Sequence, residues 1–178
     1  MKLGEKGYTL IELLIAITIM VLASGAAGAT IFQIFRGMEG NNDHMTAVHQ
    51  VQNAGYYISR DAQMAQSVTT DGLTLPDFLV LNWTEWDEDG DPIYHSATYF
   101  LEELTDGIGK LKRSHWSSAG ANEQTLVAEY IYYDPSDVDS TSKVSYQEPV
   151  LTAQLTALYE ETLETREYRI KHRVQTFE

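Results

Sequence analysis

Cysteine is absent from the 178-residue chain. The protein therefore has no disulfide bond, no thiol nucleophile and no cysteine-ligated metal site. Basic residues are few, because 12 Lys and Arg stand against 26 Asp and Glu, for a net charge of −14. This balance argues against direct binding of nucleic acid and against polybasic attachment to anionic lipid, both of which need Lys and Arg. Proline is scarce too, and none of the four precedes Pro76, so nothing interrupts a long N-terminal helix.

Charge is also missing from one long stretch near the N-terminus. The 23 residues from Leu13 to Phe35 carry none, and as a helix they would be about 35 Å long, enough to cross a bilayer core of about 30 Å. Charges cancel over the first 40 residues, so the whole excess of 14 negative charges lies in residues 41–178. Lys2 and Lys6 precede the apolar stretch and predict a cytoplasmic N-terminus, with the acidic remainder outside.

Three interpretations of this segment compete: a permanent anchor, a cleaved secretory signal, or a more specialised element. A secretory signal is supported by the basic leader, by Leu13–Leu22 as its apolar region and by Ala27-Gly28-Ala29 as a cleavage site. Glu12 argues against it, because a carboxylate in an apolar segment is costly and usually functional. The apolar stretch also continues to Phe35, where a mature secreted protein should become polar.

The segment Lys6-Gly7-Tyr8-Thr9-Leu10-Ile11-Glu12-Leu13-Leu14 resembles the prepilin signature of type IV pilins and type II secretion pseudopilins. The resemblance implies a prepilin peptidase that cuts after Gly7 and methylates the new N-terminal residue, Tyr8. It also implies that Glu12, the fifth residue counted from Tyr8, is an assembly carboxylate that pairs with the N-terminal amine of a neighbouring subunit. A buried amine and a buried carboxylate are costly alone and tolerable together, so this pair would set the register of assembly.

Small residues in the apolar stretch point to helix–helix packing. Ser24 and Gly28 are four residues apart, as are Gly25 and Ala29, a spacing that lets two helices approach closely. Many major pilins have proline at the twenty-second mature position, which here is Ala29. This departure from the family pattern favours a minor subunit over a major, filament-forming one.

The predicted fold class is α+β and pilin-like: a long N-terminal transmembrane helix packed on an antiparallel β-sheet head. We expect a leader at residues 1–7, the transmembrane half of the helix at 8–36, its amphipathic half at 37–69 and an extracytoplasmic β head at 70–178.

Glycines at 37 and 40 favour a joint between the two halves of the helix. The apolar period of the amphipathic half predicts a sheet-facing stripe, made of Met45, Val48, Val51, Gly55, Ile58, Ala62 and Ala65. Arg60 and Asp61 are assigned to the polar remainder.

The head reads as roughly seven strands with no βαβ crossover, which favours an antiparallel sheet. Expected strands cover residues 78–86, 92–103, 110–116, 125–133, 150–159 and 165–174, with a polar loop at 134–142. The segments Ile58–Ala65 and Gly109–Arg113 are similar to the helix end and a head strand of J-type minor pseudopilins.

Chemistry in the head is sparse. Asp87, Asp89 and Asp91 are weak calcium candidates, but an EF-hand needs Gly and Glu where this loop has Pro92 and Thr98, so an acidic hairpin turn is the simpler expectation. No HExxH, GxSxG, Walker A or GxGxxG motif is found, so we expect no catalytic residue and no cofactor, calcium apart.

The sequence thus predicts a non-enzymatic minor pilin or pseudopilin, single-pass in the cytoplasmic membrane. Its partners would be a prepilin peptidase and other subunits of a secretion, pilus or competence fibre, with no direct nucleic acid. The alternative is an exported β-domain, either a binding protein or a hydrolase, released by signal peptidase after Ala29.

Overall fold

The computed structural model describes residues 9–73, 76–120 and 122–171, apart from the side chain of residue 39. It has one helix, α1 (Leu10–Met64), and eight strands within these ranges. The chain divides into two compact units, residues 1–42 and 43–178, so α1 begins in the first unit and ends in the second. Gly7 and Tyr8, the predicted cleavage and methylation positions, lie outside the described residues.

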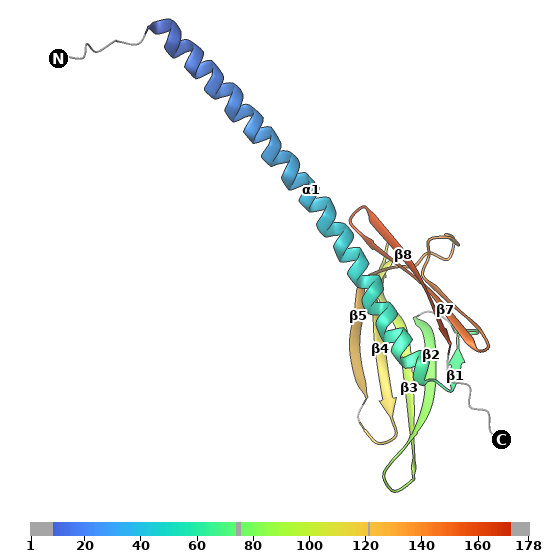
Figure 1. Ribbon diagram of the computed structural model, residues 1–178. Helices are drawn as coiled ribbons and strands as arrows, with labels where there is room; N and C mark the ends of the chain where they lie inside the picture. The colour runs from blue at the N-terminus through green and yellow to red at the C-terminus, as the bar shows by residue number, and fades with distance from the viewer. Residues whose placement is uncertain (1–8, 74–75, 121, 172–178) are drawn as a thin grey trace. The chain divides into compact units, whose positions relative to one another are not determined.

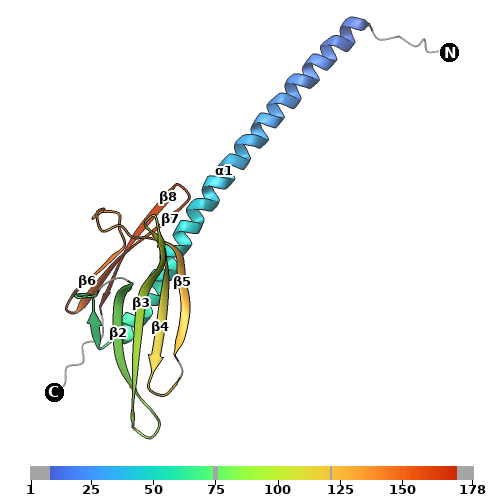
Figure 2. The ribbon, with the colours of Figure 1, turned by 180° about the vertical axis from the view of Figure 1, so that it is seen from behind.

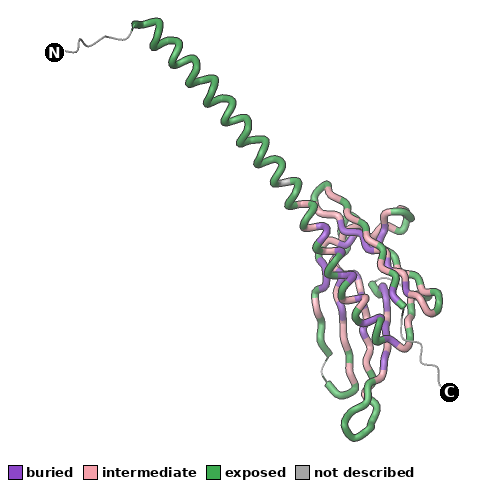
Figure 3. Tube along the Cα trace, in the orientation of Figure 1, coloured by how far each residue is buried: buried purple, intermediate pink, exposed green. Residues whose placement is uncertain are grey.

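The first unit contains the apolar part of α1, and its described residues are exposed, as the colour of the tube in Figure 3 indicates. Leucine, alanine and isoleucine dominate this part, and the absence of proline leaves the helical hydrogen bonds unbroken. Its two threonine hydroxyls bond back to the helix: Thr18 Oγ1 donates to the Leu14 carbonyl at 2.8 Å, and Thr30 Oγ1 to the Ala26 carbonyl at 3.0 Å. Such bonds satisfy hydroxyl groups within the helix itself, as an apolar environment requires.

In the second unit, α1 buries one face against the sheet. The buried positions of the helix recur mainly at three and four residues: Ala47, Val48, Val51, Ala54, Gly55, Ile58, Asp61 and Ala62. Ala65, just after the helix end, is buried too. Met45, assigned to this stripe from the sequence, is instead exposed. The helix ends at Met64, before the predicted boundary, and β1 (Ser67–Thr69) takes the place of its expected last turn. The reason is pairing, since β1 lies antiparallel to β2 and the Gln66 amide donates to the Asn82 carbonyl at 2.8 Å.

The sheet is antiparallel, which confirms the α+β architecture, and has eight strands where roughly seven were predicted. After β1 come β2 (Asp77–Trp86), β3 (Pro92–Thr105), β4 (Ile108–Ser117), β5 (Glu123–Tyr132), β6 (Lys143–Gln147), β7 (Val150–Tyr159) and β8 (Thr162–Lys171). Hydrogen bonding runs in the order β1-β2-β3-β4-β5-β7-β6, and β8 pairs with β7 along its whole length, outside this order (Figures 1 and 2). The sequence gives no separate signal for the short β6.

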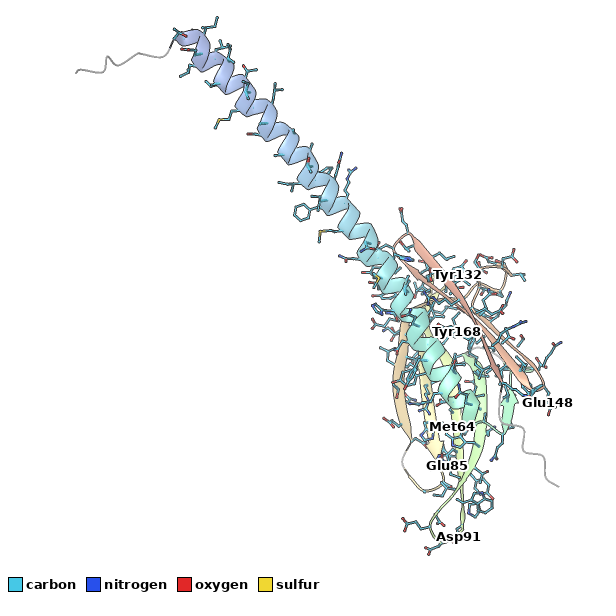
Figure 4. The ribbon with its side chains drawn as sticks, in the orientation of Figure 1. Met64, Glu85, Asp91, Tyr132, Glu148 and Tyr168 are labelled. Atoms are coloured by element: carbon cyan, nitrogen blue, oxygen red, sulfur yellow. The ribbon has the colours of Figure 1, made fainter. Side chains whose placement is uncertain are left out.

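The core lies between the helix and the inner face of the sheet, the face that carries Leu79, Leu81 and Tyr99. One approach is especially close: a Cβ on Gly55 would lie 2.1 Å from the ring of Tyr168 on β8. The Tyr168 hydroxyl donates to the Val51 carbonyl of α1 at 3.0 Å (Figure 4 labels Tyr168). Gly55 therefore makes room for a ring that joins the last strand to the helix.

Candidate functional site

The first turn of α1 is closed by a capping box formed by Thr9 and Glu12. The Glu12 amide donates to Thr9 Oγ1 at 3.4 Å, and Glu12 Oε2 accepts from the Thr9 amide at 2.9 Å and from its hydroxyl at 2.8 Å. This reciprocal arrangement satisfies amides that a helix N-terminus leaves unpaired. Sequence reasoning assigned Glu12 to assembly and overlooked this role, although the Thr9-x-x-Glu12 spacing was the signal for it.

The capping box occupies one oxygen of the Glu12 carboxylate. Among the described residues none donates a hydrogen bond to the other oxygen, Oε1. A carboxylate can accept several hydrogen bonds, so capping and an additional contact with a cation are chemically compatible. Capping also fixes the side chain, which lowers the entropy cost of such a contact.

The apolar part of α1 is long and apolar enough to cross a membrane. Its length and composition meet this requirement, and its most apolar stretch has no buried residue. Ser24, Gly25, Gly28 and Ala29 lie exposed in the apolar part of α1, and a Cβ on either glycine would meet nothing within 4 Å. The small residues thus leave room for a partner helix, and their role in packing stays a prediction.

A buried ionic cluster joins the end of α1 to the sheet. Asp61 is fully buried, and its Oδ2 accepts from the Tyr99 hydroxyl at 2.7 Å and from Arg113 Nε at 2.5 Å. Its Oδ1 accepts from Arg60, which lies at 3.1 Å and also stacks on the Tyr57 ring. The assignment of Asp61 to the polar face was therefore wrong. Its position in the three-and-four spacing of the buried stripe was the signal, and its charge outweighed that spacing in the sequence interpretation.

The partners in this cluster support one another electrostatically. Burial, and then the neighbouring Asp61 carboxylate, raise the pKa of Tyr99 well above its usual range, so Tyr99 remains a hydrogen-bond donor. Burial opposes the charge on Arg113, but the hydrogen bond and attraction from Asp61 outweigh it, and the pKa of Arg113 is raised. Arg113 on β4 and Tyr99 on β3 are cross-strand partners, so one carboxylate from the helix binds two neighbouring strands.

Two histidines form a second cluster that the sequence did not predict. His95 Nδ1 and His115 Nε2 are 3.2 Å apart, and both rings stack in parallel with Trp83. Glu85 lies 3.5 Å from the other nitrogen of His95 and accepts the indole N–H of Trp83 at 3.1 Å. Burial, and then the positive charge of Arg113, lower the pKa of His115. The pairing depends on the register of β2, β3 and β4, which spacing along the chain does not reveal.

The three aspartates proposed as weak calcium ligands lie at the turn between β2 and β3, where Figure 4 labels Asp91. Asp87 Oδ1 accepts from the amides of Asp89 and Asp91 at 3.0 and 2.7 Å. The carboxylate of Asp87 thus stabilises its own turn. Within the described ranges no three His, Asp or Glu side chains gather as a metal site, and calcium binding by the three aspartates stays a prediction.

Comparison with known protein families matches residues 2–28 to a family described as the prokaryotic N-terminal methylation motif. No curated protein and no solved structure matches the chain. The match contains Gly7, Tyr8 and Glu12 and supports a type IV pilin-like protein, a structural subunit processed by a prepilin peptidase. It ends within the apolar part of α1, so it does not extend to the head or distinguish a J-type subunit.

Proposed function

We propose that the chain is a non-enzymatic minor pilin or pseudopilin, of the J type or close to it. It assembles through its N-terminal helix into a type II secretion, type IV pilus or competence fibre, at the tip or in the initiation complex. The observation that carries this proposal is the methylation motif over residues 2–28, followed by an exposed apolar helix. A helix exposed on all sides needs lipid or other helices to cover it.

The proposed mechanism is packing between helices, with Glu12 setting the register. Cleavage after Gly7 frees an amine at Tyr8, and the Glu12 carboxylate of an adjacent subunit accepts it. The capping box favours this step because it holds Glu12 in one geometry while leaving Oε1 for the incoming amine. Downstream, the small residues at positions 24, 25, 28 and 29 allow neighbouring helices to approach closely.

The minor, J-type assignment depends on two further features. Ala29 stands where many major pilins have proline, and the Arg60-Asp61 pair of the J-like segment lies in the buried cluster at the end of α1. This cluster holds the end of α1 against the head sheet. In a fibre subunit, such a connection would couple contacts made by the head to the packing of the helices.

Mass spectrometry of the native N-terminal peptide tests the proposal. A methylated Tyr8 at the mature N-terminus is expected. A mature N-terminus at Thr30 would refute it and favour the exported β-domain released by signal peptidase, whereas an intact Met1 would favour a plain anchor.

The role of Glu12 is tested separately by cross-linking the chain to co-expressed fibre subunits. Glu12→Ala should lose the cross-links while its cleavage remains intact, and Glu12→Asp should keep part of them. Glu5→Ala, in the leader that cleavage removes, is the matched control. Undiminished cross-linking in Glu12→Ala would show that Glu12 has no part in assembly.

A further inference from the structure

Three aromatic side chains lie exposed on the outer face of the head sheet, the face opposite α1. Trp86 is 68% exposed, Tyr94 54% and Trp116 44%. Their shared face follows from the register: Trp86 pairs with Pro92 on β3, and Trp116 pairs with Ser96, so both point the same way as Tyr94. Exposed aromatic groups in one place indicate a binding surface.

The three rings form a diagonal row across β2, β3 and β4. Tyr94 is two residues from each of the β3 partners of the tryptophans, and diagonal neighbours in a sheet are about 7–8 Å apart, within reach of aromatic side chains. Within the described residues, the Tyr94 hydroxyl and the indole N–H groups of Trp86 and Trp116 have no hydrogen-bond partner. Trp83, on the inner face, differs, because its N–H is committed to Glu85.

A depression of about 330 Å³ lies beside this row. Six of its lining residues belong to the outer face: Ser67, Asn82, Thr84, Tyr94, Ser96 and Trp116. Asn82 Nδ2 donates to Ser67 Oγ at 3.2 Å, which orders two of these polar groups. The volume falls in the lower part of the range of small-ligand sites.

The lining contains no Asp, Glu, Lys or Arg, although these residues make up 21% of the chain. The other three lining residues are Gln66, Trp83 and His95. A charged ligand would therefore find no carboxylate, ammonium or guanidinium group in the depression, whereas a neutral ligand with many hydroxyl groups would find hydroxyl and amide partners. A sugar ring has apolar C–H groups on its faces and hydroxyls on its rim, which match aromatic faces and the polar groups around them.

From this match we propose that the outer face of β1–β4 binds a neutral saccharide, with Tyr94 and Trp116 stacking on sugar rings in the depression. Trp86 extends the row toward the Asp87–Asp91 turn and contacts a further ring. Ser67, Asn82, Thr84 and Ser96 bond to the sugar hydroxyls. The site lies wholly in the head and requires no helix assembly.

The test is titration of the purified full chain with cellotetraose, chitotetraose, maltotetraose and laminaritetraose, in a detergent without a sugar headgroup. Tryptophan fluorescence and calorimetry are the readouts. We expect at least one sugar to bind, and both Tyr94→Ala and Trp116→Ala to weaken binding by about tenfold or more. Trp116→Phe should retain part of the affinity, because the ring face remains.

Leu163→Ala is the matched control, because Leu163 on β8 is 45% exposed, nearly the same fraction as the 44% of Trp116, and it does not line the depression. It should bind like wild type, and near-ultraviolet circular dichroism should confirm that all variants fold. The proposal is overturned if none of the four sugars binds at millimolar concentration, or if Tyr94→Ala and Trp116→Ala bind as well as wild type. Loss of cross-linking to fibre subunits in these variants, with no sugar bound, would instead identify a protein-docking surface.

Discussion

Removing the Asp61 carboxylate should destabilise the head strongly. Asp61→Ala leaves the Arg113 guanidinium, only 6% exposed, without its anion and leaves the buried Tyr99 hydroxyl without its acceptor. Breaking a buried ion pair on one side costs about 3–5 kcal/mol, a third or more of the stability of many domains. For a unit of this size the melting temperature should fall by roughly 10–15 °C.

The measurement is urea unfolding of the full chain in mild detergent, followed by near-ultraviolet circular dichroism. The control is Glu167→Ala, which removes an ion pair with Arg169 at 3.2 Å whose partners are both more than half exposed. It should cost less than about 1 kcal/mol. Asp61→Leu combined with Arg113→Met and Tyr99→Phe should recover most of the loss, because it removes both buried partners of the carboxylate, and apolar replacement of a whole buried ionic group is often neutral. If Asp61→Ala costs no more than Glu167→Ala, the buried cluster does not hold the helix to the sheet.

Three further predictions concern other contacts. Gly55→Ala should destabilise the head by about 1–3 kcal/mol, because the new methyl group displaces the Tyr168 ring. Gly37→Ala should not destabilise the protein, because the space around Gly37 is open, and thermal unfolding of the two variants compares them. The stability of the head should fall as the pH drops below about 6.5, because the pKa of His115 is lowered in the folded protein and the unfolded chain therefore takes up the proton first. Urea unfolding at several pH values should show that the free energy of unfolding of His115→Gln depends less on pH than that of the wild type. The same pH dependence in both proteins would contradict this assignment. Thr9→Val should weaken fibre cross-linking less than Glu12→Ala, because it removes the hydroxyl of the capping box and keeps the carboxylate; equal losses would mean that Glu12 acts through its cap.

The sequence predicted the helix and the antiparallel sheet because both follow from local patterns. A proline-free apolar run specifies α1, and alternation between turns specifies strands such as β2 and β3. The capping box at Thr9 and Glu12 was equally local and could have been identified. Asp61 was assigned to the exposed face of the helix because of its charge, although the spacing of the apolar residues predicts that this position is buried.

Other features depend on pairs of residues far apart in the chain. The need for glycine at position 55 comes from Tyr168, and the contact between His95 and His115 comes from strand register. A shift of one residue in that register would turn one imidazole to the other face. The short β6 is stabilised by its pairing with β7, so its own five residues carry little signal.

The hydrogen bond from Tyr168 to Val51 joins positions 117 residues apart, and it has a consequence for biogenesis. The helix leaves the ribosome before β8, which packs on Gly55, because the two joined positions are 117 residues apart. Until then the apolar stripe of the helix lacks its final cover, and contacts of such long range slow folding. Completion of the head must therefore wait for synthesis of the β7–β8 hairpin, and truncation within β8 should leave a membrane-inserted chain that proteases degrade.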